Sequence, residues 1–102
     1  MLHLDLHIQP QTANKLKKIL ASAPDQEAFA RSVIAYQVSE LQKGILNIRL
    51  DLRQFEEKHG QSSEAFYRAY EQGAVGDGED MMVWAGLVEM LRDNERQLQE
   101  IA

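Results

Sequence analysis

Residues 34–55 read IAYQVSELQKGILNIRLDLRQF, and the spacing of their apolar residues decides the expected fold. From Ile34 onward, these residues recur at alternating intervals of four and three, for three full heptads. This is the a/d pattern of a helix that packs lengthwise against another helix. The pattern comprises Ile34, Val38, Leu41, Ile45, Ile48, Leu52 and Phe55. The sequence therefore predicts one long helix as the main element of the chain.

The ends and the middle of this helix carry further signals. Asp25 is the expected N-cap, and Gly60 is the expected residue just past the C-terminus. Gly44 costs about 1 kcal/mol relative to alanine, so it marks either a kink or a close approach by another backbone. Leu46 and Leu50 lie off the heptad stripe, which predicts a buried face broader than a narrow seam.

Residues 2–8 read LHLDLHI and alternate strictly between apolar and polar side chains. Period two predicts a half-buried strand. A lone strand leaves its backbone groups unpaired, and the sequence offers no second strand, so we expect the strands of two chains to pair about a two-fold axis. The expected fold is mainly α, with an N-terminal strand pairing across a homodimer, followed by a long helix and two further helices.

The expected homodimer is held together by apolar side chains of this strand and of the long helix. They are Leu2, Leu4, Leu6, Ile8, Phe29, Val33, Ile34, Val38, Leu41, Ile45 and Ile48.

Shorter helices are expected on either side of the long one. Pro10 opens a helix over residues 10–23, and Pro24 ends it. Ser62 or Ser63 caps a third helix, and a last helix begins near Glu79 after a connecting loop over residues 73–80.

Composition excludes several classes of function. The chain has no cysteine, which removes disulfides, thiolate zinc sites and cysteine nucleophiles. No apolar run approaches the roughly 18 residues of a membrane span, and the N-terminus lacks the basic region of a signal peptide. We expect a cytoplasmic protein without a membrane partner. No combination of residues indicates catalysis, so the chain is not expected to be an enzyme, and neither a metal nor a cofactor is predicted.

Charge differs between the two halves of the chain, whose net charge is −5. Residues 1–50 carry six basic and four acidic residues, whereas residues 51–102 carry five basic and twelve acidic ones. This asymmetry favours a polyanion as partner of the first half and a basic or polar protein surface as partner of the second. Two solvated faces would give the same asymmetry.

The candidate DNA-binding residues lie in the first half. His3, Asp5 and His7 share the outward face of the expected strand, and a two-stranded ribbon fits the DNA major groove. The same three side chains could instead hold a metal or simply face solvent. Gln26, at a helix N-terminus that exposes free N–H groups, and Arg31 nearby are the candidate phosphate contacts.

Aromatic side chains mark the candidate partner-binding surface in the second half. Aromatic residues among polar ones are enriched at binding hot spots, although core packing of the third helix on the fourth is the favoured explanation and both could hold. The candidates are Phe66, Tyr67, Tyr70, Trp84, Leu87 and Leu91.

The order of elements in residues 1–43 resembles a ribbon-helix-helix domain. The resemblance rests on the amphipathic segment 2–8, the helix opened by Pro10, the turn at Pro24, and the inward positions of Phe29, Val33 and Ile34. It implies that the strands of two chains form a ribbon that enters the DNA major groove. By position, it makes His3, Asp5 and His7 the base-reading residues and the segment around Gln26 the phosphate contact.

The second half resembles the C-terminal module of small prokaryotic antitoxin-like proteins. The motifs are FEEKHG (55–60), SSEAFY (62–67), EQG (71–73), GDGED (76–80) and WAGL (84–87). The resemblance implies a dimerisation and DNA-binding-like domain at 1–43, a helical extension at 44–60 and a toxin-binding module at 61–102. It implies an antitoxin that neutralises a cognate toxin and that could also bind operator DNA. The alternatives are a repressor without a toxin partner and a coiled-coil adaptor that does not bind DNA.

Overall fold

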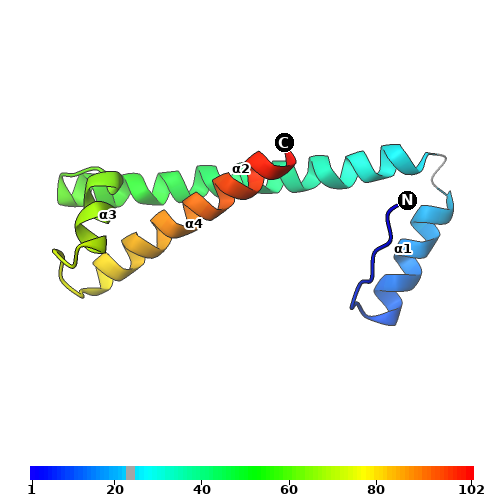
Figure 1. Ribbon diagram of the computed structural model, residues 1–102, viewed down its shortest axis with the longest axis horizontal. Helices are drawn as coiled ribbons and strands as arrows, with labels where there is room; N and C mark the ends of the chain where they lie inside the picture. Colours follow the sequence, from blue (N-terminus) through cyan, green and yellow to red (C-terminus); the bar gives the residue numbers. More distant parts are fainter. Residues whose placement is uncertain (23–24) are drawn as a thin grey trace. The chain divides into compact units, whose positions relative to one another are not determined.

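The computed structural model describes residues 1–22 and 25–102, and Figure 1 shows the four helices found in these residues. They are α1 (Pro10–Ser22), α2 (Gln26–His59), α3 (Ser63–Glu71) and α4 (Glu79–Ile101). The predicted helix stop at Pro24 lies outside the described residues. The chain divides into two compact units, Met1–Ala35 and Tyr36–Ala102, and the boundary falls within α2.

The predicted N-terminal strand is wrong. Residues 1–9 form neither a helix nor a strand, and the described part of the chain contains no strand at all. A strand requires a ladder of hydrogen bonds to a neighbouring strand. The alternation in residues 2–8 creates one apolar and one polar side, but it provides no such neighbour. The chain is mainly helical, and the ribbon-helix-helix fold with strands paired across a homodimer is not its fold.

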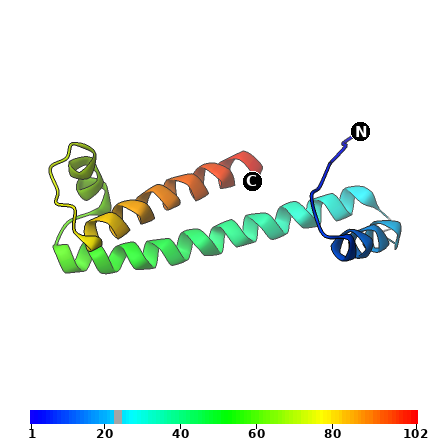
Figure 2. The same cartoon turned by 90° about the horizontal axis from the view of Figure 1, so that it is seen from below.

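The first unit, Met1–Ala35, has no core of its own. Figure 2 shows residues 1–9 as an irregular segment that leads into α1. None of the described residues in this unit is buried, although the unit is rich in large apolar side chains. The exposed ones are Leu2, Leu4, Leu6, Ile8, Ile19, Leu20, Val33 and Ile34.

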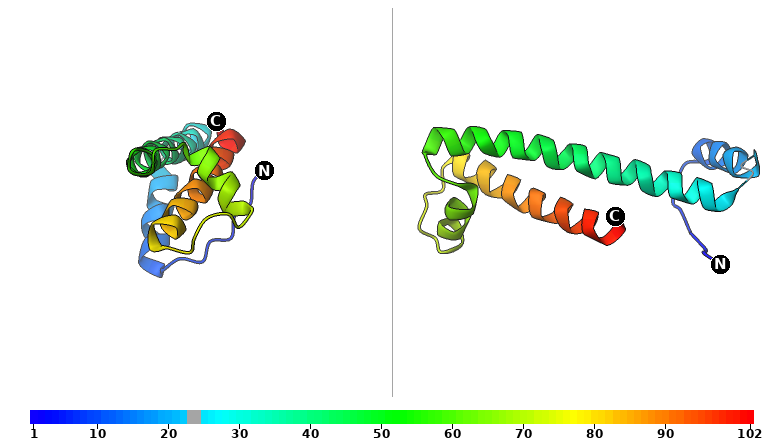
Figure 3. Two further views of the ribbon diagram at one scale, coloured as in Figure 1. Left: turned by 90° about the vertical axis from the view of Figure 1, so that its left-hand side faces the viewer. Right: turned by 90° about the horizontal axis from the view of Figure 1, so that it is seen from above.

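The second unit, Tyr36–Ala102, is a helical hairpin with a short helix at its closed end. Figures 1 and 3 show α4 running back along α2 from the end where α2 stops. Lys58 Nζ lies 2.6 Å from Asp80 Oδ2 near that end, and Arg49 Nη2 lies 3.2 Å from Glu95 Oε2 further along. The order of these two ion pairs shows that α2 and α4 are antiparallel.

The chain reverses at Gly60, as predicted. Its φ angle is +65°, in the left-handed region that glycine adopts without the steric cost of a Cβ atom. Its N–H donates to the carbonyl of Glu56 at 2.8 Å. Gly60 thus ends α2 and lets α3 begin three residues later.

The core of the second unit forms between the heptad stripe of α2 and the inner faces of α3 and α4. The buried cluster consists of Ile48, Leu52, Phe66, Tyr67, Trp84, Ala85 and Val88. The prediction that the heptad stripe packs against a helix is confirmed, but the helix is α4 of the same chain. Leu41 and Ile48, two of the predicted dimerisation residues, are buried within one chain. Phe29, Val38 and Ile45 are half-buried.

Gly44 lies beside a side chain of α4, not beside another backbone as predicted, and the helix is not interrupted there. A Cβ atom at this position would lie 3.2 Å from Nδ2 of Asn94 on α4, while α2 continues through Gly44 as a helix. The predicted broad buried face is wrong, because Leu46 and Leu50 retain 59% and 52% of their exposure.

Candidate functional site

The start of α3 joins all three helices of the second unit. Ser62 is the N-cap, and its Oγ accepts a hydrogen bond from the N–H of Ala65 at 3.1 Å. Ser63 is therefore free to face the core. Its N–H donates to Glu56 Oε2 on α2 at 2.9 Å, and its Oγ accepts from Trp84 Nε1 on α4 at 2.9 Å.

Trp84 is the centre of an aromatic stack. Its ring lies parallel to that of Phe66, with centroids 3.9 Å apart and an interplanar angle of 1°. Phe55 and His59 of α2 stack near it, with centroids 5.7 Å and 5.2 Å from the Trp84 ring. Phe66 and Trp84 are both 0% exposed. The alternative explanation, packing of α3 on α4, therefore holds for Phe66 and Trp84, which lie in the core that positions the surrounding surface.

His59 is the polar member of this stack. Its Nε2 is buried without a hydrogen-bond partner, 3.5 Å from Asp80 Oδ2. Asp80 in turn receives a hydrogen bond from Lys58. This bond, with a smaller contribution from His59, lowers the pKa of the Asp80 carboxyl. The contacts hold the first turn of α4 against the last turn of α2.

Tyr67 lies at the edge of the core. Its hydroxyl donates to Glu89 Oε1 at 3.0 Å, and this hydrogen bond is the main reason why the pKa of Tyr67 is raised. The guanidinium of Arg92 lies 4.4 Å from the centroid of the same ring, which is a cation–π distance. Tyr67, like Phe66 and Trp84, is thus largely occupied by contacts inside the chain.

The other predicted partner-binding residues differ in their exposure. Leu87 and Leu91 are partly buried against the core. Tyr70 is 36% exposed, and its ring packs against those of Phe66 and Tyr67. Tyr70 is therefore the member of the predicted set that offers most surface to a partner.

A shallow groove of about 230 Å³ lies between the three helices of the second unit. Leu52, Val88 and Leu91 contribute its apolar lining, and its charged lining is mixed. The charged residues are Arg49, Arg92, Glu56, Glu64 and Glu95. Among the described residues, no group of three or more histidine, aspartate and glutamate side chains could hold a metal ion.

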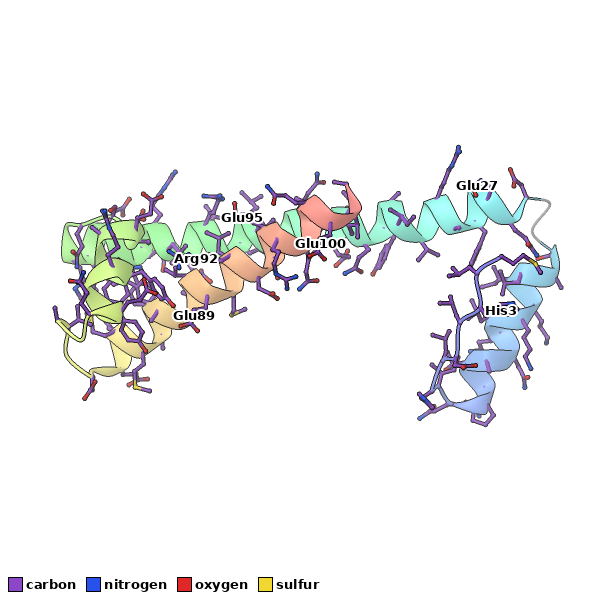
Figure 4. All side chains as sticks on the ribbon, viewed as in Figure 1. His3, Glu27, Glu89, Arg92, Glu95 and Glu100 are labelled. Atoms are coloured by element: carbon purple, nitrogen blue, oxygen red, sulfur yellow. The ribbon has the colours of Figure 1, made fainter. Side chains whose placement is uncertain are left out.

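The strand that was expected to carry the DNA-reading residues is absent from the described residues. His3, Asp5 and His7 are exposed in the irregular segment before α1, and Figure 4 labels His3 there. At the start of α2, the predicted cap is confirmed, since Asp25 Oδ1 accepts from the N–H of Glu27 at 3.0 Å.

The candidate phosphate contacts lie beside these acidic residues. Gln26 is the first residue of α2, and Arg31 Nε lies 3.1 Å from Glu27 Oε1 in an exposed ion pair. A carboxylate at this distance competes with a phosphate for the guanidinium.

An exposed apolar face of α4 was missed at the level of sequence. Met82, Val83 and Met90 are 62%, 49% and 55% exposed, and Gly86 lies between them. The sequence contains a signal for this face: a glycine inside a helix, flanked by apolar residues that do not lie on the side of α4 that carries the core residues Trp84 and Val88.

No helix in the described part of the chain combines the length and the apolar character needed to cross a membrane. Comparison with protein-family models, with curated proteins and with solved structures gave no match to this chain.

Proposed function

We propose that this chain is an antitoxin-like binding protein. Two copies associate through the N-terminal unit, and the C-terminal helical unit binds and neutralises a cognate toxin protein. The activity is binding rather than catalysis.

The observation that carries this proposal is the missing core of Met1–Ala35. Most of its large apolar side chains are exposed and none is buried. A monomer normally exposes only scattered single apolar residues. Each square ångström of apolar surface that association covers contributes roughly 25 cal/mol. A second copy presents the same surface, so one symmetric contact covers both.

The charge of the second unit supports a basic protein as its partner. The unit has its own core, so its surface is preorganised for binding. Residues 51–102 carry twelve acidic and five basic residues. A negative surface attracts and orients a positive one and raises the association rate. The proposal therefore requires of the toxin a basic surface that an acidic helical unit can cover.

The proposal is tested by growth. The short open reading frame adjacent to this gene is expressed alone and together with this protein. We expect growth arrest that co-expression relieves. A truncation that ends at Gly60 removes α3 and α4 and is expected to lose the relief; if it still neutralises the toxin, the C-terminal unit is not the binding unit.

The homodimer is tested separately by sedimentation. Leu20→Asp and Val33→Asp place a carboxylate on the exposed apolar surface of the first unit and are expected to shift the protein toward monomer. Leu46→Asp is the control, because Leu46 is an exposed leucine (59%, against 37% for Leu20 and 52% for Val33) that lies in the second unit. An equal effect of all three substitutions would refute dimerisation through the first unit.

A helical adaptor that does not bind DNA is the second candidate. It is favoured by the absence of a strand from the described residues, because no two-stranded ribbon is then present to read a major groove. The adaptor predicts no binding to the DNA upstream of its gene even at low salt. Binding to that DNA with a steep salt dependence would favour a repressor that contacts phosphates through other residues.

A further inference from the structure

The face of α4 that points away from the core has the chemistry of a docking site. Met82, Gly86 and Met90 are spaced four residues apart and form one line on the helix, and Val83 lies beside them. Trp84, Ala85 and Val88 lie on the opposite side, in the core. We call Met82, Val83, Gly86 and Met90 the methionine face.

Gly86 has no role within its own chain. A glycine inside a helix costs about 1 kcal/mol relative to alanine, and a Cβ atom at Gly86 would meet nothing within 4 Å. Gly44 is the contrast, because a Cβ there would press on Asn94 at 3.2 Å. The missing side chain at Gly86 instead leaves room for a partner to approach the α4 backbone between the two methionines.

Acidic side chains extend this face at both ends and along one edge. Glu79 precedes Met82 by three residues, and Asp93 and Glu100 follow Gly86 at intervals of seven, which keeps them on the same side of the helix.

Figure 4 shows Glu89 and Glu100 on α4. Asp93 and Glu100 share one cation, Arg96. Glu79 and Glu89 have no ion-pair partner within the described residues, so the face is net negative.

We propose that the methionine face receives a cationic amphipathic helix from a protein partner. Its apolar side chains pack on Met82, Val83 and Met90, its backbone or a small residue approaches Gly86, and its lysines or arginines meet the acidic residues. Methionine suits this task because its unbranched side chain adapts to the shape of an incoming helix. The inference rests on the proposed function, since it names the chemistry of the toxin segment that the C-terminal unit binds.

The first test uses synthetic peptides and the full-length protein. A fluorescent peptide with leucines and lysines in amphipathic helical order is compared with a scrambled peptide of the same composition and with one that carries glutamate in place of lysine. We expect fluorescence anisotropy to show at least tenfold tighter binding of the amphipathic lysine peptide, weakening as salt is added. Equal binding of the ordered and scrambled peptides would overturn the proposal.

Two variants locate the site. Met90→Lys places a positive charge on the methionine face and is expected to weaken peptide binding at least tenfold. Leu50→Lys is the matched control on the outward face of α2, because Leu50 is 52% exposed and Met90 is 55% exposed. The control is expected to bind the peptide like the parent; equal loss in both variants would show that charge alone governs binding and would overturn the site.

Gly86→Ala separates docking from folding. The added methyl group fits the chain and improves helix propensity, so the melting temperature is expected to stay unchanged or rise. Peptide binding is expected to fall several-fold, because the methyl group occupies the space left for the partner. Higher stability with unchanged binding would overturn the role of Gly86.

Two outcomes distinguish failure of this inference from failure of the proposed function. If Met90→Lys neutralises the toxin as well as the parent protein does, the methionine face is not the toxin-binding site and the proposed function stands. If the peptide results are as expected but no toxin is neutralised, the proposed function is wrong and the face stands. A change of oligomeric state in Met90→Lys without loss of peptide binding would make the face a contact between copies of this chain and would overturn the inference.

Discussion

Replacing Ser63 with alanine tests whether the contact between α3 and α4 stabilises the second unit. The Ser63 hydroxyl accepts the indole N–H of Trp84 at 2.9 Å, and the Trp84 side chain is 0% exposed. In Ser63→Ala, the indole N–H is left buried without this acceptor. An unsatisfied buried donor costs about 1–3 kcal/mol. Removal of the small hydroxyl group leaves a cavity that is too small to add much to this cost.

The expected loss is large enough to measure by thermal or urea denaturation. For a domain of this size, 1 kcal/mol lowers the melting temperature by about 4–8 °C. Circular dichroism is the readout, because it follows the helices and does not depend on the Trp84 side chain, which a further variant below replaces. Ser39→Ala is the control in the same unit, because Ser39 makes no side-chain hydrogen bond within the described residues; its effect is expected to stay within about 0.5 kcal/mol.

A double-mutant cycle isolates the hydrogen bond itself. Trp84→Phe removes the donor and also leaves a cavity, so it destabilises on its own. In the double variant with Ser63→Ala, neither partner is left unsatisfied. We expect this variant to be destabilised by at least about 1 kcal/mol less than the sum of the two single-variant effects. Strict additivity, or a loss below about 0.5 kcal/mol in Ser63→Ala, would refute the reasoning.

Three further predictions concern the ends and the edge of the hairpin. The hydrogen bond from Lys58 lowers the pKa of Asp80, so the stability from this contact is complete above the unfolded pKa of about 3.9 and is lost as the pH falls through the lower folded value. Asp80→Asn should therefore be less stable than the parent at neutral pH but not in strong acid, by denaturation at both pH values. The hydrogen bond to Glu89 raises the pKa of Tyr67. The stability that this hydrogen bond contributes is therefore present below about pH 10 and is lost as the pH rises through the pKa of Tyr67 in the folded state. Spectrophotometric titration should show one tyrosine ionising late, and Tyr67→Phe should remove that step. Gly60→Ala forces a side chain into a φ of +65° and should destabilise by about 1 kcal/mol; an unchanged melting temperature would contradict this.

The helix boundaries could be predicted because they depend on local chemistry. Asp25 and Ser62 accept backbone hydrogen bonds at the starts of α2 and α3, as their positions predicted. Gly60 adopts the left-handed conformation expected at a helix C-terminus. α4 begins at Glu79, where acidic residues favour the positive end of the helix dipole. Each of these signals involves a few adjacent residues.

The errors concern partners, which local patterns do not identify. The alternation in residues 2–8 predicted a strand, but alternation alone supplies no hydrogen-bonding neighbour. The heptad stripe through Leu41 and Ile48 predicted a helical neighbour without identifying it, because a helix from the same chain satisfies the same spacing as one from a second copy.

The aromatic residues show the same limit at the candidate site. Phe66 and Trp84 were assigned to a partner surface, yet they stack on each other in the core. Aromatic composition is shared by cores and binding hot spots, so it does not distinguish them. The methionine face could have been found, because Gly86 carries the same helix-weakening signal that drew attention to Gly44.

The coreless first unit has a calorimetric consequence. The heat-capacity change of unfolding arises mainly from newly exposed apolar surface and averages about 12–15 cal/mol/K per residue in globular proteins. In a single copy, most of the large apolar side chains from Leu2 to Ile34 are exposed and none is fully buried, so unfolding adds less apolar surface there than in a unit with a core. An isolated chain should therefore show a flatter stability curve than its length suggests, and the proposed dimerisation predicts that the curvature increases with protein concentration.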